Sequence, residues 1–288
     1  MTTARRILPR LLVVAALALG AAACADITSE PTGESAPHTH TSRPAGDGTR
    51  ASYVGYALAD LTFPKKAGIP GTLSFQITTY QGAAQKDFAT ELTKKMHVYV
   101  VRSDLSLLRH VHPTMAADGT WSGNLTVPVD GTYRVVTEFT ALGPGGKADQ
   151  LVLGDERSLG KPVASLAVPA ATTSATHDGL TVTVGDPPTV GYEHQMTLGI
   201  SKGSEPAALG TYLSVYAHVS AFNVKTGALV HMHPLGSPET KDGQSVLSFH
   251  TGFEVPGDYR MFVQTRVSGI VHTIPITVAV TGQQAPEL

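Results

Sequence analysis

Cysteine is almost absent from this chain of 288 residues, which contains one, Cys24. A single cysteine excludes an intramolecular disulfide, a cysteine-based zinc finger and a blue-copper centre, which needs a thiolate ligand. Charged residues are also scarce, at 15%, and aromatic residues make up 6%. The chain instead has 42% apolar residues, 29 glycines and 12 histidines. This composition is typical of a soluble β protein.

Long hydrophobic runs are lacking except near the start. Three arginines within the first ten residues precede an apolar run over residues 11–19, which is too short to be a good membrane span. Small residues then lead directly to Cys24. We expect residues 1–23 to be a secretory signal peptide.

The small residues before Cys24 resemble the lipobox of bacterial lipoproteins, although Ala21 stands where leucine is usual. A lone cysteine in an exported chain has no disulfide partner, so we expect a thioether-linked lipid that anchors the protein to the membrane surface. The expected location is therefore extracytoplasmic, on the cell membrane. The alternative is an ordinary signal peptide with an incidental cysteine, which would give a secreted protein.

Removal of residues 1–23 takes away three arginines and no acid, so the net charge changes from −2 to −5. This acidic balance argues against a nucleic-acid partner. Residues 24–52 are rich in Ser, Thr, Pro and Gly and are expected to be a lipidated, disordered tether. Its His38 and His40 are expected to be solvated, and weak, non-specific metal capture is the alternative. We expect domain 1 over residues 53–169, a linker over 170–176 and domain 2 over 177–288.

Short alternating segments separated by turn residues predict an all-β protein with two tandem antiparallel β-sandwiches of immunoglobulin-like type. Only residues 85–94 have a partly helical pattern. The expected strands are 72–77, 97–101, 123–127, 133–139, 163–168, 180–184, 195–200, 212–222, 245–249, 259–266 and 272–280. Tyr133 and Tyr259 each follow a glycine turn at the start of a strand and resemble the tyrosine corner of such sandwiches.

One histidine pattern occurs twice, with a gap of 13 residues from the first histidine to the pair in both copies. The copies are His97 with His110-Val111-His112-Pro113, and His218 with His231-Met232-His233-Pro234. The offset between copies is 121 at the histidines and 126 at the two tyrosines. We therefore infer an internal duplication, with a five-residue insertion in the polar loop 237–243 of the second copy.

Strand geometry predicts that each set of three histidines converges. His110 and His112 share one face because side chains two residues apart point the same way. A hairpin turn places His97 opposite one or the other, depending on where the turn is centred. Opposed Cβ atoms lie about 4.5–5.5 Å apart, so three imidazoles can reach one ion. The predicted ligands of Cu(II) or Zn(II) are His97, His110, His112, His218, His231 and His233. Affinity is expected to fall below about pH 6, as histidines protonate.

The remaining candidates have weaker patterns. Met96 and Met232 point away from the neighbouring histidines and are expected in the core. His250 corresponds to Asn124 in the first copy and is either a fourth ligand or a surface histidine. The histidines without a repeat counterpart are expected to have no special role; these are His177, His194 and His272.

The segment 96–105, the His-x-His-Pro segments and the Gly131-Thr132-Tyr133-Arg134 turn resemble a family of largely uncharacterised exported proteins from actinobacteria and proteobacteria. The resemblance covers most of residues 53–280. It implies a β-sandwich and, by association, handling of a metal, usually copper, in the cell envelope.

The leading hypothesis is an exported, lipid-anchored envelope protein that binds copper or zinc through one three-histidine site per domain and has no catalytic residues. One alternative is a non-catalytic interaction module with structural histidines and an envelope protein partner not identified by the sequence. Another is a dismutase-like copper enzyme, although the chain lacks the ligand-rich loop and disulfide of that family. No nucleophile elbow, His-Glu-x-x-His helix or phosphate loop is present.

Overall fold

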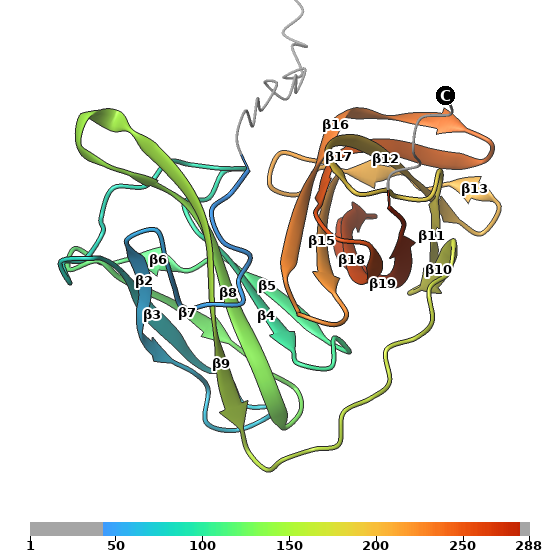
Figure 1. Cartoon of the computed structure of the whole chain (residues 1–288). Coiled ribbons are helices and arrows are strands. Elements are labelled where there is room, and N and C mark those ends of the chain that lie inside the picture. The colour runs from blue at the N-terminus through green and yellow to red at the C-terminus, as the bar shows by residue number, and fades with distance from the viewer. Residues whose placement is uncertain (1–42, 283–288) are drawn as a thin grey trace, which may run out of the picture. The chain divides into compact units, whose positions relative to one another are not determined.

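The computed structural model of the chain describes residues 43–282, except for the side chains of Tyr192, Glu193, His231 and His233. The predicted signal peptide, Cys24, and the histidines at 38 and 40 lie outside the described residues. Within the described part the chain is all-β, with one short 3-10 turn at Pro144–Gly146 (Figure 1). That part contains no helix long and apolar enough to cross a membrane.

The first sandwich is built from nine strands. They are β1 (Ser52–Tyr53), β2 (Tyr56–Thr62), β3 (Gly71–Thr79), β4 (His97–Arg102), β5 (Leu108–Val111), β6 (Thr114–Met115), β7 (Thr120–Leu125), β8 (Gly131–Leu142) and β9 (Ala148–Leu159). One antiparallel sheet has the order β1-β2-β3-β7-β6, and the other has the order β5-β4-β8-β9. Alternate residues of β3 and β4 point inward, and Phe75 and Val100 meet in a fully buried core between the sheets.

The second sandwich repeats this plan with longer strands. They are β10 (Ser174–His177), β11 (Leu180–Val184), β12 (Gly191–Lys202), β13 (Glu205–Pro206), β14 (Leu209–Gly210), β15 (Ala217–Asn223), β16 (Leu229–Lys241), β17 (Gln244–Phe253), β18 (Gly257–Val267) and β19 (Ile270–Val280). The first half of β16 pairs with β15 and its second half pairs with β17, so one strand joins the two layers. The inserted residues lengthen the β16–β17 hairpin, which has a bulge between Leu235 and Glu239.

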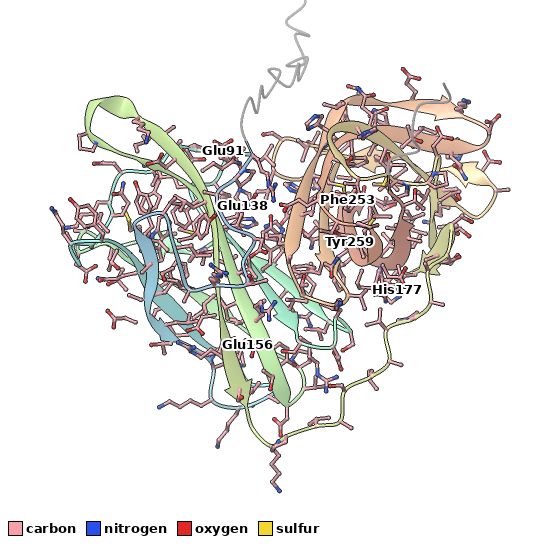
Figure 2. All side chains as sticks on the ribbon, viewed as in Figure 1. Glu91, Glu138, Glu156, His177, Phe253 and Tyr259 are labelled. Atoms are coloured by element: carbon pink, nitrogen blue, oxygen red, sulfur yellow. The ribbon has the colours of Figure 1, made fainter. Side chains whose placement is uncertain are left out.

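Both expected tyrosine corners are confirmed. The Tyr133 hydroxyl donates to the Val129 carbonyl at 2.7 Å, and the Tyr259 hydroxyl donates to the Val255 carbonyl at 3.0 Å. The glycine two residues before each tyrosine has a φ of 139°, which L-residues rarely adopt. Figure 2 shows Tyr259 beside Phe253, and their ring centroids lie 4.7 Å apart. These equivalent corners support the duplication.

Replacing either corner tyrosine with phenylalanine is expected to lower the free energy of unfolding by about 1 kcal/mol, because the variant loses the hydrogen bond from the tyrosine hydroxyl to the backbone. Urea unfolding of Tyr133→Phe and Tyr259→Phe measures this change. Tyr80→Phe is the control, since Tyr80 is 82% exposed. Equal stability of all three variants would contradict a structural role for the corners.

Two predicted elements are wrong. Residues 85–94 form turns and bridges instead of a helical segment, because their backbone bonds to β3 and β8 where the chain passes from one sheet to the other. Residues 163–168 form no strand; Val163 and Leu166 are 50% and 60% exposed, so their alternation has no core to cover. The strand that follows β8 is β9, over residues that we did not predict to be a strand.

The predicted end of the tether is also corrected. Ala45 donates to the Gln150 carbonyl at 2.8 Å and accepts from the Val152 amide at 3.0 Å, so the chain is bonded to β9 well before residue 53. At the other boundary, β9 ends at Leu159 and β10 begins at Ser174, so the segment between the sandwiches spans residues 160–173 instead of the predicted range 170–176.

Candidate metal centre

The register of β4 and β5 decides which histidines face each other. Val98 pairs with Val111 and Tyr99 pairs with His110, which places His97 opposite His112. This is one of the two registers expected from the sequence. The three histidines share the face of the sheet that points away from the core of the first sandwich.

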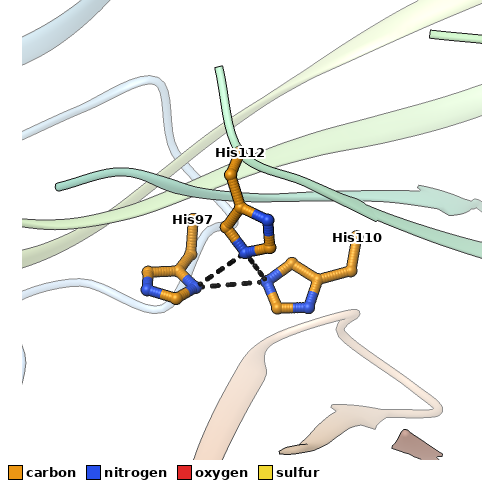
Figure 3. Close-up of side chains that lie close together, drawn as sticks. All are labelled: His97, His110 and His112. Carbon is orange, nitrogen blue, oxygen red and sulfur yellow. Dashed lines mark hydrogen bonds between the residues drawn. The ribbon is translucent and has the colours of Figure 1, made fainter. Parts of the chain in front are cut away.

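The three imidazoles converge through one nitrogen each (Figure 3). Nδ1 of His97 lies 3.2 Å from Nε2 of His110 and 3.2 Å from Nε2 of His112. The two Nε2 atoms lie 3.1 Å apart. Three nitrogens at these separations could all bind one transition-metal ion at the usual ligand distance of about 2.0–2.1 Å. The geometry therefore suits a tetrahedral ion with one open position.

Hydrogen bonds on the outer side fix two of the tautomers. Nε2–H of His97 donates to the Glu91 carbonyl at 3.0 Å. Nδ1–H of His110 donates to Oε1 of Gln264 at 2.8 Å. The Gln264 amide group donates from Nε2 to Thr273, which keeps its oxygen toward His110. A neutral imidazole has one N–H, so both inward nitrogens carry lone pairs, as metal ligands require.

Burial keeps this cluster in its neutral form. His97 is 2% exposed. Burial lowers the pKa of His110 well below its ordinary value, and positive charge on the neighbouring histidines would lower it further. Burial also lowers the pKa of His112 to about 3, with added effects of His97 and Lys94. The expected loss of affinity below about pH 6 therefore moves to more acidic pH, because protons compete less with the metal.

The same pKa shifts predict that the metal-free protein loses stability in acid. Since the folded-state pKa values of His110 and His112 are lowered, the unfolded chain takes up protons first as pH falls below about 6.5. The free energy of unfolding should then fall by up to about 1.4 kcal/mol per pH unit for each group. Urea unfolding at pH 7.5 and at pH 5 measures this change. Between the two pH values the free energy of unfolding should fall less in the double variant His110→Gln/His112→Gln than in the wild type. His272→Gln is the control, and equal losses in all three proteins would contradict the prediction.

The second copy repeats the outer support of the first histidine. His218 is 1% exposed, and its Nε2–H donates to the Tyr212 carbonyl at 3.0 Å. Glu91 and Tyr212 each stand six residues before the histidine and begin a tight turn. The central residues of both turns have positive φ; they are Leu92 at 45°, Thr93 at 69°, Leu213 at 53° and Ser214 at 67°. Sequence reasoning missed these turns, although a leucine followed by threonine or serine at the same spacing was the available signal.

His231 and His233 are placed by their backbone alone. His231 pairs with Ser220 on β15, and His233 pairs with His250 on β17. His231 therefore has the register position that His110 has in the first copy. His250 has the register position of Asn124, as the sequence alignment of the copies predicted.

The other candidates lie away from the cluster. Met96 and Met232 are 1% and 0% exposed and belong to the two cores, which confirms their predicted packing. His177 and His272 each lie 3.6 Å from a carboxylate oxygen of Asp178, and His194 lies 3.4 Å from the Thr189 hydroxyl.

Tyr99 and Glu138 also belong to the site, although the sequence did not predict them there. The Tyr99 ring stacks on the His110 ring, with centroids 4.4 Å apart. Its hydroxyl donates to Oε2 of Glu138 at 3.0 Å. Burial is the main cause that raises the pKa of Tyr99 well above its ordinary value, and the negative charge of Glu138 raises it further. Glu138 lies directly opposite His97 on β8. A buried carboxylate therefore stands beside the histidine cluster, where it favours cation binding.

Comparisons with known structures find distant likenesses. A tetra-tandem repeat from the extending region of a large adhesion protein is 15% identical, with a TM-score of 0.26, over 78% of this chain and 48% of that one. Invasin, a bacterial integrin-binding protein, is 14% identical, with a TM-score of 0.22, over 81% and 40%. A putative membrane anchored protein from Corynebacterium diphtheriae is 11% identical, with a TM-score of 0.22, over 81% and 60%. The chain spans about half the length of these structures, and TM-scores this low tell nothing of its function.

Comparison with curated proteins gives no significant match. One family profile, described as "Domain of unknown function (DUF8832)", matches residues 52–148 and 174–282. The first matched segment covers β1 to β8 of the first sandwich and the second covers β10 to β19. Since they cover well over half of the chain, the protein belongs to the DUF8832 family.

Proposed function

We propose that the protein binds a transition metal, copper or zinc, through His97, His110 and His112, and through His218, His231 and His233 in the second copy. The observation that supports this most strongly is the triangle of inward nitrogens with sides of 3.1–3.2 Å, two of them held as lone-pair donors by outer hydrogen bonds. Neutral imidazoles are ligands that both metals accept. The role is capture or delivery of the ion, without catalysis.

We further propose that this occurs outside the cytoplasm, with the protein anchored to the membrane through Cys24. The support is the basic and apolar start of the chain and its lone cysteine after small residues. Fractionation of cells that express the wild type and Cys24→Ala tests the anchor. The wild type should sediment with membranes and the variant should be released; equal distribution would contradict lipidation.

Calorimetric titration of the full chain with Cu(II) and with Zn(II) at pH 7.4 tests the metal site. Saturable binding at micromolar or tighter affinity is expected. It should be weakened in the triple variant His97→Ala/His110→Ala/His112→Ala. The matched control replaces the three histidines outside the pattern, His177, His194 and His272, and should bind as the wild type does. Equal binding by the two triple variants would contradict the proposal.

A second candidate is an interaction module with structural histidines. The hydrogen bonds from His97 to Glu91 and from His110 to Gln264 favour it, because structural histidines make such bonds as well. It predicts no saturable metal binding and an unfolding free energy that falls when either bond is removed.

A further inference from the structure

The histidine face of the first sandwich is covered by the second. Both sandwiches belong to one compact unit of the chain. Val98 and Val100 point into the core of the first sandwich, whereas Tyr99 and Val101 point the other way. The latter pack in a separate buried cluster with residues of the second sandwich, namely Phe222, Leu229 and Phe262.

The two sandwiches meet through equivalent positions. The offset of 121 relates Val101 to Phe222 and Leu108 to Leu229, and the offset of 126 relates Val136 to Phe262. All six residues belong to the same cluster. Contact between equivalent faces is the arrangement of a two-fold dimer, here within one chain.

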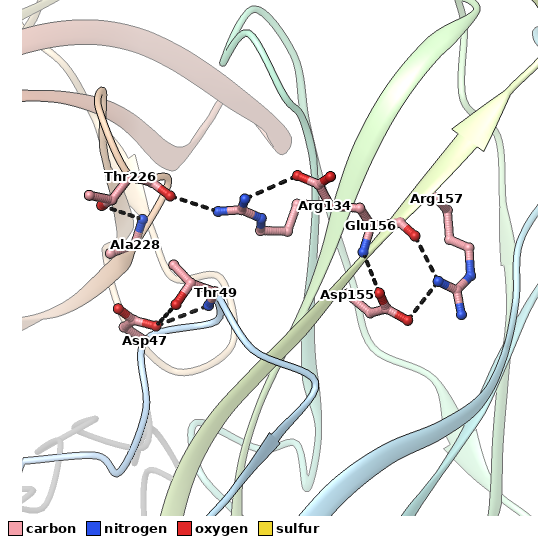
Figure 4. A network of polar contacts seen from close by, with 8 residues as sticks. All are labelled: Asp47, Thr49, Arg134, Asp155, Glu156, Arg157, Thr226 and Ala228. Carbon is pink, nitrogen blue, oxygen red and sulfur yellow. Dashed lines mark hydrogen bonds and ion pairs between the residues drawn. The ribbon is translucent and has the colours of Figure 1, made fainter.

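Polar contacts flank this apolar cluster. Arg134 donates to the Thr226 carbonyl at 3.0 Å and is paired with Glu156 at 3.0 Å (Figure 4). The Leu229 amide donates to the Asp47 carbonyl at 2.8 Å. Aromatic packing together with these bonds holds the two histidine faces against each other.

The first histidine of the second copy lies beside the first triad. The ring centroid of His218 is 5.8 Å from that of His110 and 6.4 Å from that of His97. Its direct partner on β18 is Gln264, the residue that accepts the hydrogen bond of His110. Gln264 thus crosses the interface to orient a ligand of the other copy.

The register extends this symmetry. Glu138 is opposite His97, as Gln264 is opposite His218, and the offset between them is the 126 found at the tyrosines. His231 pairs with Ser220, which has the same parity on β15 as His218. His233 follows two residues later. The backbone therefore brings all six histidines to one interface.

We propose that the two histidine sets form one paired centre, which holds two transition-metal ions in the interface between the sandwiches, with Gln264 as a positioning residue for His110. This inference rests on the proposed function. Each ion lies about 2 Å beyond a ring nitrogen, so the ring distances place the two ions within about 12 Å of each other. Because a residue of one sandwich orients a ligand in the other, ion binding and docking of the sandwiches support each other.

Electron paramagnetic resonance of the full chain loaded with Cu(II), together with metal analysis, tests the pairing. Two ions per chain are expected, with spectra broadened by magnetic interaction between them. The variants His97→Ala/His110→Ala/His112→Ala and His218→Ala/His231→Ala/His233→Ala should each retain one ion with the spectrum of an isolated Cu(II).

Each other outcome has a distinct meaning. Two ions with isolated spectra in the wild type would overturn the pairing and leave the proposed function standing. If the wild type binds one ion per chain and neither triple variant binds any, the paired centre would be replaced by a single site shared by both histidine sets. The absence of saturable binding would overturn the proposed function, and the pairing with it.

The role of Gln264 has its own test. Gln264→Leu should weaken binding of the ion at the first triad by about 10–100-fold, the usual effect of losing an outer partner of a ligand. Gln264→Glu should restore most of the affinity, since it keeps an acceptor and reproduces the residue at the equivalent position 138. Gln76→Leu is the matched control, because the Gln76 amide bonds Thr120 within the first sandwich. Equal affinity of Gln264→Leu and the control, or failure of Gln264→Glu to rescue, would overturn the role.

Discussion

Replacing His110 with alanine is expected to weaken metal binding at the first triad by more than about 100-fold, because even the loss of an outer-shell partner commonly costs 10–100-fold. His110 contributes one of the three inward nitrogens and is the histidine hydrogen-bonded to Gln264. Its removal leaves His97 and His112, which can hold an ion through two bonds only. Competition for Zn(II) against a chromophoric chelator measures the change.

His177→Ala is the control for this experiment, because His177 lies on β10 and is 3.6 Å from a carboxylate oxygen of the exposed Asp178. Its affinity for Zn(II) should equal that of the wild type. If His110→Ala also kept wild-type affinity, the nitrogen triangle would have to be a structural feature without a role in metal binding.

Replacing Phe222 with alanine is expected to lower the free energy of unfolding by about 3–5 kcal/mol, the cost of deleting a fully buried phenylalanine. Phe222 is 0% exposed, and its ring packs edge-on against Phe262 at 6.1 Å. It belongs to the cluster between the sandwiches, so its loss should also loosen their contact. Urea unfolding gives the cost, and amide hydrogen exchange of β4 reports the loosening.

Phe249→Ala is the matched control, because Phe249 is equally buried but lies in the core of the second sandwich. It should cost a similar free energy while the exchange of β4 stays unchanged under native conditions. If Phe222→Ala cost less than about 1 kcal/mol, the cluster between the sandwiches would not be a tightly packed interface.

Much of the fold could be predicted because strand signals are local. Alternation placed β11 at residues 180–184 and brought β3, β4, β18 and β19 close to their observed bounds. The glycine-tyrosine turns identified both corners. The errors arose where the local pattern depends on context. Residues 163–168 alternate although Val163 and Leu166 are exposed, and the weak helical character of residues 85–94 is overridden by backbone bonds to β3 and β8.

The first triad could be predicted for the same reason. Side chains in a strand alternate with period two, so His110 and His112 had to share a face, and either hairpin register brought His97 to it. The turn that supports His97 was harder to identify. Its contact to His97 is the backbone carbonyl of Glu91, which any residue type could supply, so the side chain at position 91 does not indicate it.

The sequence by itself determined the strands, the duplication, the residue types of the candidate site and the parity that gathers three histidines. Only the tertiary structure decided which residues of the second sandwich cover these three histidines. Gln264 is 154 positions from His110, and no local pattern links the two. They meet because the apolar residues beside the histidines in both copies are buried against each other, which brings the two histidine faces together.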